Sequence, residues 1–322
     1  MRIQNVVVFH NTAAVGSAWC CAEGIVSVLR EMGYNVVDGG NPRLSQIPIS
    51  HLRNADLIIL GAPEWFAAEL QRHYGFAWPT LRAKKAAWYA ESFHRDDRDF
   101  DFNSVRNLAD HHYFPAIQDA EEYGGQWLPF GADTGVFRPQ PATVLYDAAF
   151  LGTMYPKRAE FMARIGYSLA RIQSVSSPDV RKSFELLANA YCSTRIFVNL
   201  PAYSRLLVTK VTEVMACGTF LLTPRLDHPS AYRNMAPFEN GKHLVYYDAG
   251  DPQEIAKLVY YYIENSSELE AIAAAGRDEV LKSHSMVVPL RKILSDAESG
   301  GDLVASDDPW EAAISKLAHG KN

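Results

Sequence analysis

A lysine and a glutamate lie three residues apart in "TKVTEVMACGTFLLT", residues 209–223, a stretch that predicts a helix followed by a buried strand. Side chains at this spacing share one helix face, so Lys210 and Glu213 could form an ordinary surface ion pair. They could equally contact a ligand, because a cation attracts phosphate and a carboxylate accepts hydrogen bonds from ribose hydroxyls. With Arg205 just upstream and an anion-attracting helix N-terminus, the stretch suits a nucleoside diphosphate.

A second group of cations follows a predicted strand further upstream, in "GTMYPKR" at 152–158. Lys157 and Arg158 open a predicted helix, where positive charge is slightly unfavourable. A bound anion would explain Arg158 at this position, and a solvated surface residue is the alternative. Tyr155 could stack on a nucleobase or pack the loop.

The first half of the chain places polar residues directly after predicted strands: His10, Glu64, Glu91 and His94. Ligands of open α/β sheets bind beyond the carboxyl ends of the strands, and carboxylates and histidines are common general bases. Glu91 and His94, three residues apart, are the preferred base candidates, and His10 is the next. The alternative for each is a hydrogen-bonded structural role.

Two further patterns in this half are less specific. Gly16 lies in "VGS", a short glycine loop without the spacing of a dinucleotide fingerprint. An Asp-x-Asp occurs in "HRDDRDFD" at 94–101, and carboxylates suit Mg or Mn. A charged, solvated loop is the preferred interpretation there, so no metal site is predicted.

The elements that must position these residues alternate between strands and helices. The first half predicts strands over 5–10, 34–40, 55–63 and 84–92, with a helix over 17–33. After a proline-rich linker at 135–147, the alternation restarts. The second half predicts strands over 146–154, 194–201, 219–224 and 243–248, and helices over 156–175, 176–192, 208–218, 251–265, 267–284 and 306–321. This order is typical of two doubly wound α/β domains facing a cleft.

Composition narrows the function classes. The 322 residues are 48% hydrophobic and 21% charged, which suits two globular domains. A net charge of −6 disfavours broad nucleic-acid binding, although a local basic groove is compatible with it. The four cysteines are expected to be buried thiols, and no apolar run approaches the roughly 18 residues of a membrane span. Without a signal-peptide pattern, a cytoplasmic protein is expected.

The order and spacing of several motifs resemble the GT-B glycosyltransferases, especially the CgeB-like, spore-maturation-type group. The motifs are "FLGTMYPKRAEFMARI", "KVTEVMACGTFLLT", "FENGKHLVYYDAGDPQEIAKLVYYYIEN" and "IAAAGRDEVLKSHSMVVPLRKIL", with "YAESFHRD" and "YGGQWLPFGADTGVFRP" in the first half. The resemblance implies an α/β GT-B fold of two Rossmann-like domains. The acceptor domain would span 1–140 and the donor domain 141–300, with a C-terminal helix over 301–322 that packs back on the first domain.

The resemblance also implies a donor and residue roles. The co-substrate would be a nucleotide-diphosphate sugar, UDP-sugar first, used without a cofactor or metal. Glu213 matches the glutamate that holds the ribose, and Lys210 stands where the family commonly has arginine. Arg205 stands where many retaining enzymes have glutamate, so retention and inversion both remain open. The residues assigned to the donor are Gly16, Tyr155, Arg158, Arg205, Lys210 and Glu213.

Several alternatives stay open at this point. The acceptor hydroxyl could belong to a small molecule, a polysaccharide or a hydroxymethylated DNA base. A non-catalytic nucleotide-sugar binding protein and a nucleotide-sugar epimerase of the same fold are the rival functions. The sequence does not indicate the oligomeric state.

Overall fold

The computed structural model describes residues 2–10, 22–40, 43–94, 100–172, 180–202, 206–225 and 238–299. Gly16 and Arg205, both assigned above to donor binding, lie outside the described residues. The helix predicted over 306–321 and residues 95–99 of the Asp-x-Asp segment also lie outside them. No helix among the described residues is both long and apolar enough to span a bilayer.

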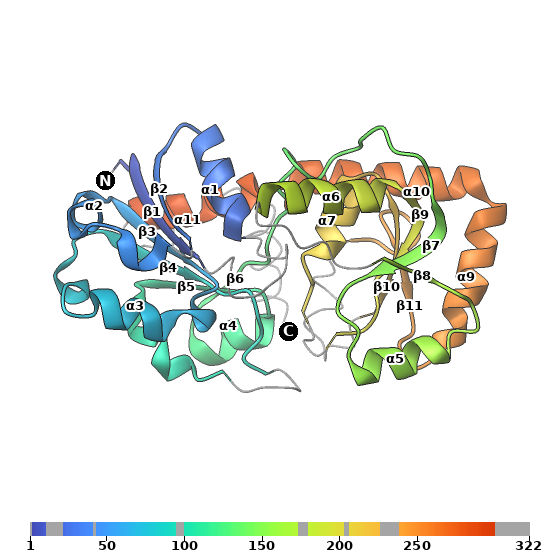
Figure 1. Cartoon of the computed structure of the whole chain (residues 1–322), viewed down its shortest axis with the longest axis horizontal. Coiled ribbons are helices and arrows are strands. Elements are labelled where there is room, and N and C mark those ends of the chain that lie inside the picture. The colour runs from blue at the N-terminus through green and yellow to red at the C-terminus, as the bar shows by residue number, and fades with distance from the viewer. Residues whose placement is uncertain are drawn as a thin grey trace, which may run out of the picture.

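Six parallel strands form the first sheet, in the order β2-β1-β3-β4-β5-β6 (Figure 1). The strands are β1 (Asn5–His10), β2 (Asn35–Gly40), β3 (Leu57–Gly61), β4 (Lys84–Trp88), β5 (His111–Phe114) and β6 (Gln126–Trp127). The helices are α1 (Ala22–Glu31), α2 (Ile49–Asn54), α3 (Ala67–Tyr74) and α4 (Ile117–Tyr123), with 3-10 turns at Arg43–Gln46, Pro63–Trp65, Trp78–Thr80, Phe102–Ser104 and Arg106–Leu108. Continuous apolar strands such as β3 are buried on both faces because separate hydrophobic clusters cover the two sides of the sheet.

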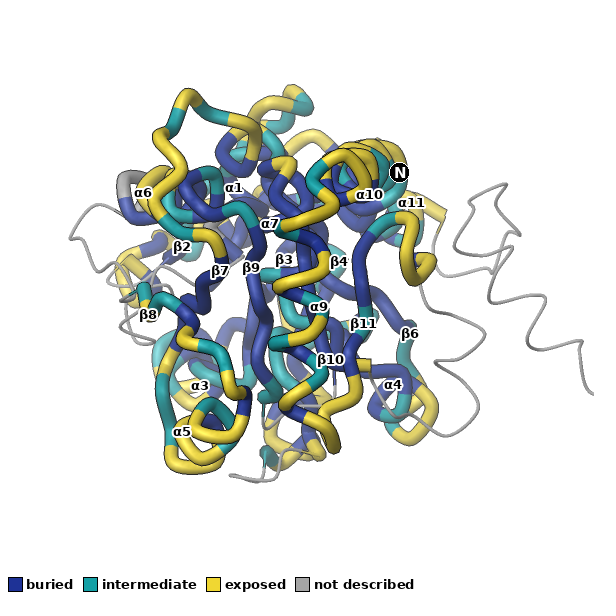
Figure 2. Tube along the Cα trace, turned by 90° about the vertical axis from the view of Figure 1, so that its right-hand side faces the viewer, coloured by how far each residue is buried: buried dark blue, intermediate teal, exposed yellow. Residues whose placement is uncertain are grey.

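Five parallel strands form the second sheet, in the order β11-β10-β9-β7-β8. They are β7 (Tyr146–Leu151), β8 (Ala170–Ile172), β9 (Thr194–Val198), β10 (Phe220–Pro224) and β11 (Val245–Tyr247). The helices are α5 (Pro156–Ala163), α6 (Val180–Cys192), α7 (Lys210–Ala216), α9 (Pro252–Glu264) and α10 (Ser266–Glu279). The central strands of both sheets are buried, whereas the outer side of α9 faces solvent (Figure 2).

One predicted helix of the second half is shorter than the sequence pattern indicated. The helix expected over 156–175 ends at Ala163, and its last part forms the edge strand β8. Gly166 follows with a left-handed φ of 69°, a conformation that stops a helix and that glycine adopts at low cost. The chain then turns back to pair with β7, Ala149 opposite Ala170.

The chain crosses between the two domains at two adjacent segments. Ala132 and Ser285 form an isolated parallel bridge, and Ala132 N–H donates to His284 O at 2.9 Å. A π-helical turn, Val280–His284, leads into this crossing. The helix α11 (Val287–Ser299) then packs against α1 and β4 of the first domain (Figure 1).

The return helix is anchored by burial and by polar contacts. Leu290 and Ile293 join the hydrophobic cluster of the first sheet, and Asp296 accepts a hydrogen bond from Tyr113 Oη at 2.7 Å. The sequence motifs placed these residues in the donor domain. The described structure therefore shows a helix that packs back on the first domain before residue 301.

Candidate functional site

Two cations meet beyond the carboxyl end of β7. Lys210, at the start of α7, donates from Nζ to Leu151 O at 3.3 Å and lies 5.7 Å from the Phe150 ring centroid. Gly152 leaves the space that this arrangement needs. A Cβ there would lie 3.0 Å from Lys210 Nζ and 3.4 Å from Arg158 Nη1. Both cations therefore converge on one short stretch of backbone.

Backbone carbonyls hold the guanidinium of Arg158 in place. It donates to Thr153 O at 2.6 Å, Pro201 O at 3.2 Å and Leu200 O at 3.4 Å, so it joins the segments that follow β7 and β9. The residue is 5% exposed, so the solvated surface position considered above is wrong. Burial of a cation beside another cation is costly unless an anion compensates.

Tyr155 belongs to the same packed loop. Its hydroxyl donates to Pro201 O at 2.8 Å, and its ring lies 4.4 Å from the Arg158 guanidinium carbon. The Phe150 ring lies on the same guanidinium at 4.9 Å. The two aromatic rings stabilise the cation through cation–π contact, so packing of this loop is an observed role of Tyr155.

Lys210 and Glu213 do not form a surface ion pair, because Glu213 is only 5% exposed. Burial, with a contribution from the nearby Arg158 charge, lowers the pKa of Lys210 to about 7. Burial raises the pKa of Glu213 to about 7, although Tyr191 Oη donates to its Oε2 at 3.2 Å. Both groups therefore change charge near neutral pH, where an arriving anion can shift their protonation.

At the carboxyl end of the first sheet, the charged side chains with shifted pKa values are acids. Glu64, in the 3-10 turn after β3, accepts hydrogen bonds at Oε1 from the N–H groups of Ala90 at 2.8 Å and Glu91 at 2.9 Å. Burial raises the pKa of Glu64 to about 8, and Glu91 adds to the effect. The sequence placed Glu64 after a strand but could not select it, because its partners lie 26 and 27 residues further along the chain.

His94 lies between two acids of α4. Its Nε2 is 2.9 Å from Glu122 Oε2 and 3.6 Å from Asp119 Oδ1. Asp119 is fully buried, which raises its pKa, and its Oδ2 accepts from Phe93 N–H at 3.0 Å. A half-exposed imidazole oriented by carboxylates is a suitable general base.

His10 lies in a different setting. It is 1% exposed, and its Nε2 is 3.0 Å from Asp38 Oδ1 on the neighbouring strand. Burial raises the pKa of Asp38, but hydrogen bonds from His10 and from Gly40 N–H outweigh it and bring the pKa to about 2. Arg43 contacts the other oxygen of Asp38. This dyad joins β1 to β2, and its depth makes His10 the least accessible of the three base candidates.

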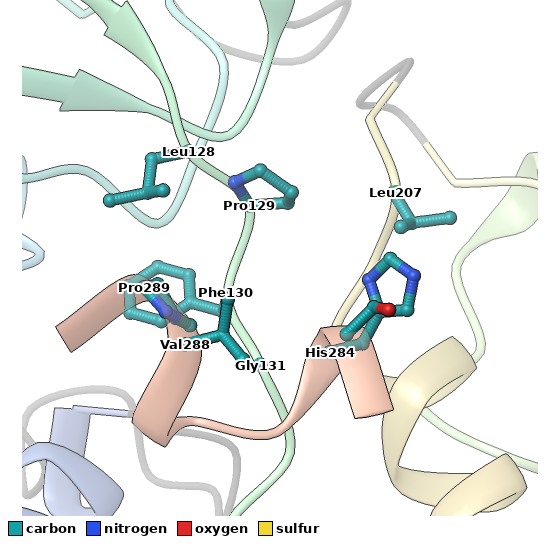
Figure 3. Close-up of a pocket in the computed structure, with 9 residues that line it drawn as sticks. Leu128, Pro129, Phe130, Gly131, Leu207, His284, Val288 and Pro289 are labelled. Atoms are coloured by element: carbon teal, nitrogen blue, oxygen red, sulfur yellow. The ribbon is translucent and has the colours of Figure 1, made fainter. Parts of the chain in front are cut away.

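A small pocket marks the joint between the domains (Figure 3). His284 and Leu207 lie on one side of it, and Leu128, Pro129 and Phe130 lie on the other. The His284 ring packs on Phe238 with centroids 4.4 Å apart. The lining is mostly apolar. Nowhere in the described part of the chain do three or more His, Cys, Asp or Glu residues gather as a metal site would require.

Part of the second half of the chain matches a known protein family. Residues 158–295 match a family described as glycosyl transferase-like, Glyco_trans_1_2, and this range contains Arg158, Lys210 and Glu213. A comparison with curated protein sequences found no match. Residues 158–295 are therefore similar to a glycosyl transferase-like domain.

Solved structures extend the likeness to most of the chain. HepE from Anabaena, in complex with UDP and glucose, shares 13% identity and a TM-score of 0.60, over 92% of this chain and 100% of that one. An alpha-glucosyltransferase in complex with UDP and a 13-mer DNA containing an HMU base shares 8% identity and a TM-score of 0.63, over 92% and 100%. Sucrose-phosphate synthase from Thermosynechococcus elongatus shares 11% sequence identity with a TM-score of 0.60, over 92% of this chain and 99% of that one.

The predicted GT-B fold of two Rossmann-like α/β domains is confirmed. The predicted glycosyltransferase class is confirmed by the family match together with the fold.

Proposed function

We propose that this protein transfers a sugar from a UDP-sugar to an acceptor hydroxyl, in the manner of the CgeB-like glycosyltransferases, and that it does so in the cytoplasm. The observation that carries the proposal is a pair of cations, the buried Arg158 and the half-buried Lys210, beside the buried Glu213 at the carboxyl end of the second sheet. Two adjacent cations favour a dianionic ligand between or beside them. UDP in the HepE and alpha-glucosyltransferase complexes is consistent with such a ligand.

The proposed donor roles follow from the contacts. Lys210 binds the diphosphate through its ammonium, which lies beside Arg158 at the carboxyl end of β7. Glu213 accepts the ribose hydroxyls. Arg158 shapes the phosphate loop through its three carbonyl contacts and contributes positive charge. Gly16 and Arg205 are proposed as further donor residues on the basis of the sequence alone.

The proposed reaction is a substitution at the anomeric carbon. The acceptor hydroxyl forms the new bond to that carbon, and the bond between the carbon and the diphosphate oxygen breaks. UDP leaves with the electron pair and is stabilised by the cations, while Glu91 or His94 takes the hydroxyl proton. His10 is a third candidate for that step. The stereochemical outcome stays open in this proposal.

Donor binding is the first test. Calorimetry with UDP and UDP-glucose should show binding by the wild-type protein and a loss for Glu213→Ala, with the fold intact by circular dichroism. Unchanged affinity in that variant would contradict the assignment of the donor site. Release of free UDP from UDP-glucose would then separate an enzyme from a binding protein, and a new nucleotide-sugar product would indicate an epimerase.

The acceptor needs a separate experiment. A duplex carrying 5-hydroxymethyluracil is a reasonable first acceptor, because a similar fold is known in complex with DNA that contains an HMU base. The net charge of −6 counts against it, so small hydroxylated molecules and polysaccharides belong in the same panel. Transfer of radiolabelled glucose to the modified duplex, absent with thymine, would identify DNA as the acceptor.

A further inference from the structure

A strained turn follows β3 in the first domain. Ala62 has φ 61° and ψ 51°, the left-handed conformation that residues other than glycine adopt at a cost. Its N–H donates to Trp88 O at 2.8 Å, and its carbonyl accepts from Trp65 N–H at 3.2 Å. The turn therefore continues the pairing with β4 and carries Glu64 to the end of that strand.

The contacts of Glu64 concentrate on one short segment. Oε1 accepts from two consecutive N–H groups, those of Ala90 and Glu91. Oε2 is buried and has no hydrogen-bond partner among the described residues. A buried carboxyl with one free oxygen is better accommodated when it is neutral, and burial accordingly raises its pKa to about 8. Glu91 and Tyr89 are the titratable groups that interact with it.

We propose that Glu64 is a positioning residue, which holds the turn after β4 in the conformation that presents Glu91 to the acceptor. The inference rests on the proposed function, in which Glu91 is a candidate base. Because one carboxyl oxygen binds both N–H groups, it fixes two successive peptide planes at once. A neutral Glu64 also adds no second negative charge beside Glu91.

The first test measures the turn itself and does not depend on activity. Amide hydrogen exchange at Ala90 and Glu91 is compared in the wild type, Glu64→Gln and Glu64→Met. Gln keeps a neutral acceptor at the same place, whereas Met has a similar length and no oxygen acceptor. We expect protection in the wild type and in Glu64→Gln, and about tenfold faster exchange at these two amides in Glu64→Met.

Three outcomes would overturn the proposal. Protection at Ala90 and Glu91 in Glu64→Met could equal that of the wild type. Protection could fall equally across the whole first sheet, which would indicate a general folding role. The two amides could also exchange in the wild type as fast as in an open loop, a result that decides the matter even if Glu64→Met does not fold.

The second test follows release of UDP from UDP-glucose. Glu64→Met should lower kcat about tenfold and leave the KM for UDP-glucose unchanged, because the donor binds at the other sheet. In a double variant with Glu91→Gln, Glu64→Met should lower kcat little further, since both changes remove the same function, a correctly placed Glu91 carboxylate. Fully additive losses would overturn the positioning role. A wild-type protein that neither binds nor cleaves any UDP-sugar would contradict the proposed function, while the exchange experiment would still decide the role of Glu64.

Discussion

The carboxyl ends of the two sheets hold their charged side chains in opposite ways. At the second sheet, backbone carbonyls at the end of β7, just after it and after β9 accept from the cations Arg158 and Lys210. At the first sheet, backbone N–H groups after β4 donate to the acid Glu64. Both arrangements occur just beyond parallel strands, where loops leave backbone groups without sheet partners.

The difference shows how two domains of one architecture can serve two chemistries. The cation-rich end is suited to a diphosphate, and the acid-rich end is suited to removing a proton from a hydroxyl. The two sheet ends also differ in the backbone that positions these side chains. Gly152 leaves room for cations at one end, whereas the left-handed Ala62 delivers an acid at the other.

The largest effect should come from removing the anchored arginine. Arg158→Met removes a buried side chain that donates to three backbone carbonyls and contacts two aromatic rings, so the free energy of unfolding should fall by about 3 kcal/mol. Urea denaturation measures it. Arg195→Met, which removes a partly exposed ion pair with Asp147, should cost less than about 1 kcal/mol. Equal effects of the two substitutions would break the comparison, because carbonyl anchoring would then be unimportant.

Removing the second cation should weaken anion binding more than folding. Lys210→Met should reduce the affinity for UDP by about 10- to 100-fold, the loss expected for one charge-assisted hydrogen bond. Calorimetry measures the change, and Lys242→Met, at an exposed lysine paired with Glu239, is the control. Affinity that survives in Lys210→Met would remove Lys210 from the donor site.

The same site should respond to pH. Lys210 has a pKa near 7, so in the free protein it is charged below pH 7 and neutral above it. Glu213 gains negative charge over the same range. Both changes disfavour an anion, so pyrophosphate affinity of the wild type should fall between pH 6 and pH 8. In Lys210→Met the decline in affinity should be smaller. A wild-type affinity for pyrophosphate that rises with pH would contradict the assignment of Lys210 and Glu213 to an anion site.

The acidic end should show a pH effect on stability. The pKa of Glu64 is raised from 4.5 to about 8 by folding, so its contribution is complete below pH 4.5 and is lost as pH rises towards 8. Glu64→Gln lacks this loss. The free energy of unfolding of Glu64→Gln, relative to that of the wild type, should therefore rise by about 1 to 2 kcal/mol between pH 5 and pH 8, as measured by urea denaturation. Glu121→Gln, at an exposed position on α4, should show no such trend.

The smallest effect should come from the strained turn. Ala62→Gly relieves the left-handed strain but increases the freedom of the unfolded chain, so stability should rise by no more than about 1 kcal/mol. Gly124→Ala, at another left-handed position, should lower stability by about the same amount. A thermal unfolding series measures both, and a loss of stability in Ala62→Gly would show that the turn is not strained.

The sequence predicted the cation-rich end of the second sheet better than the acid-rich end of the first. Lys210 and Glu213 lie on one helical turn, so periodicity alone placed them together, and the motifs from 152 to 224 supplied their neighbours. Glu64 and the amide of Glu91 meet only because β3 pairs with β4, Gly61 opposite Trp88. The spacing of residues along the chain does not predict the register in which β3 pairs with β4.

Element boundaries show the same limit. Gly166 ended a helix that the residue pattern continued to 175, because a single left-handed residue redirects the chain to an edge strand. The return of α11 to the first domain depends on apolar residues that would suit either domain equally well. Helical periodicity indicates that such a face is buried but not what it is buried against.

By itself, the sequence determined the alternation of strands and helices, the two-domain α/β architecture and the local pairing of a cation with an acid on α7, because each depends on residues close together in the chain. Only the tertiary structure decided which groups are buried and which backbone atoms meet them. Burial moves Lys210, Glu213 and Glu64 towards neutral pKa values. It does so through desolvation, which depends on everything packed around a side chain and not on its neighbours in sequence.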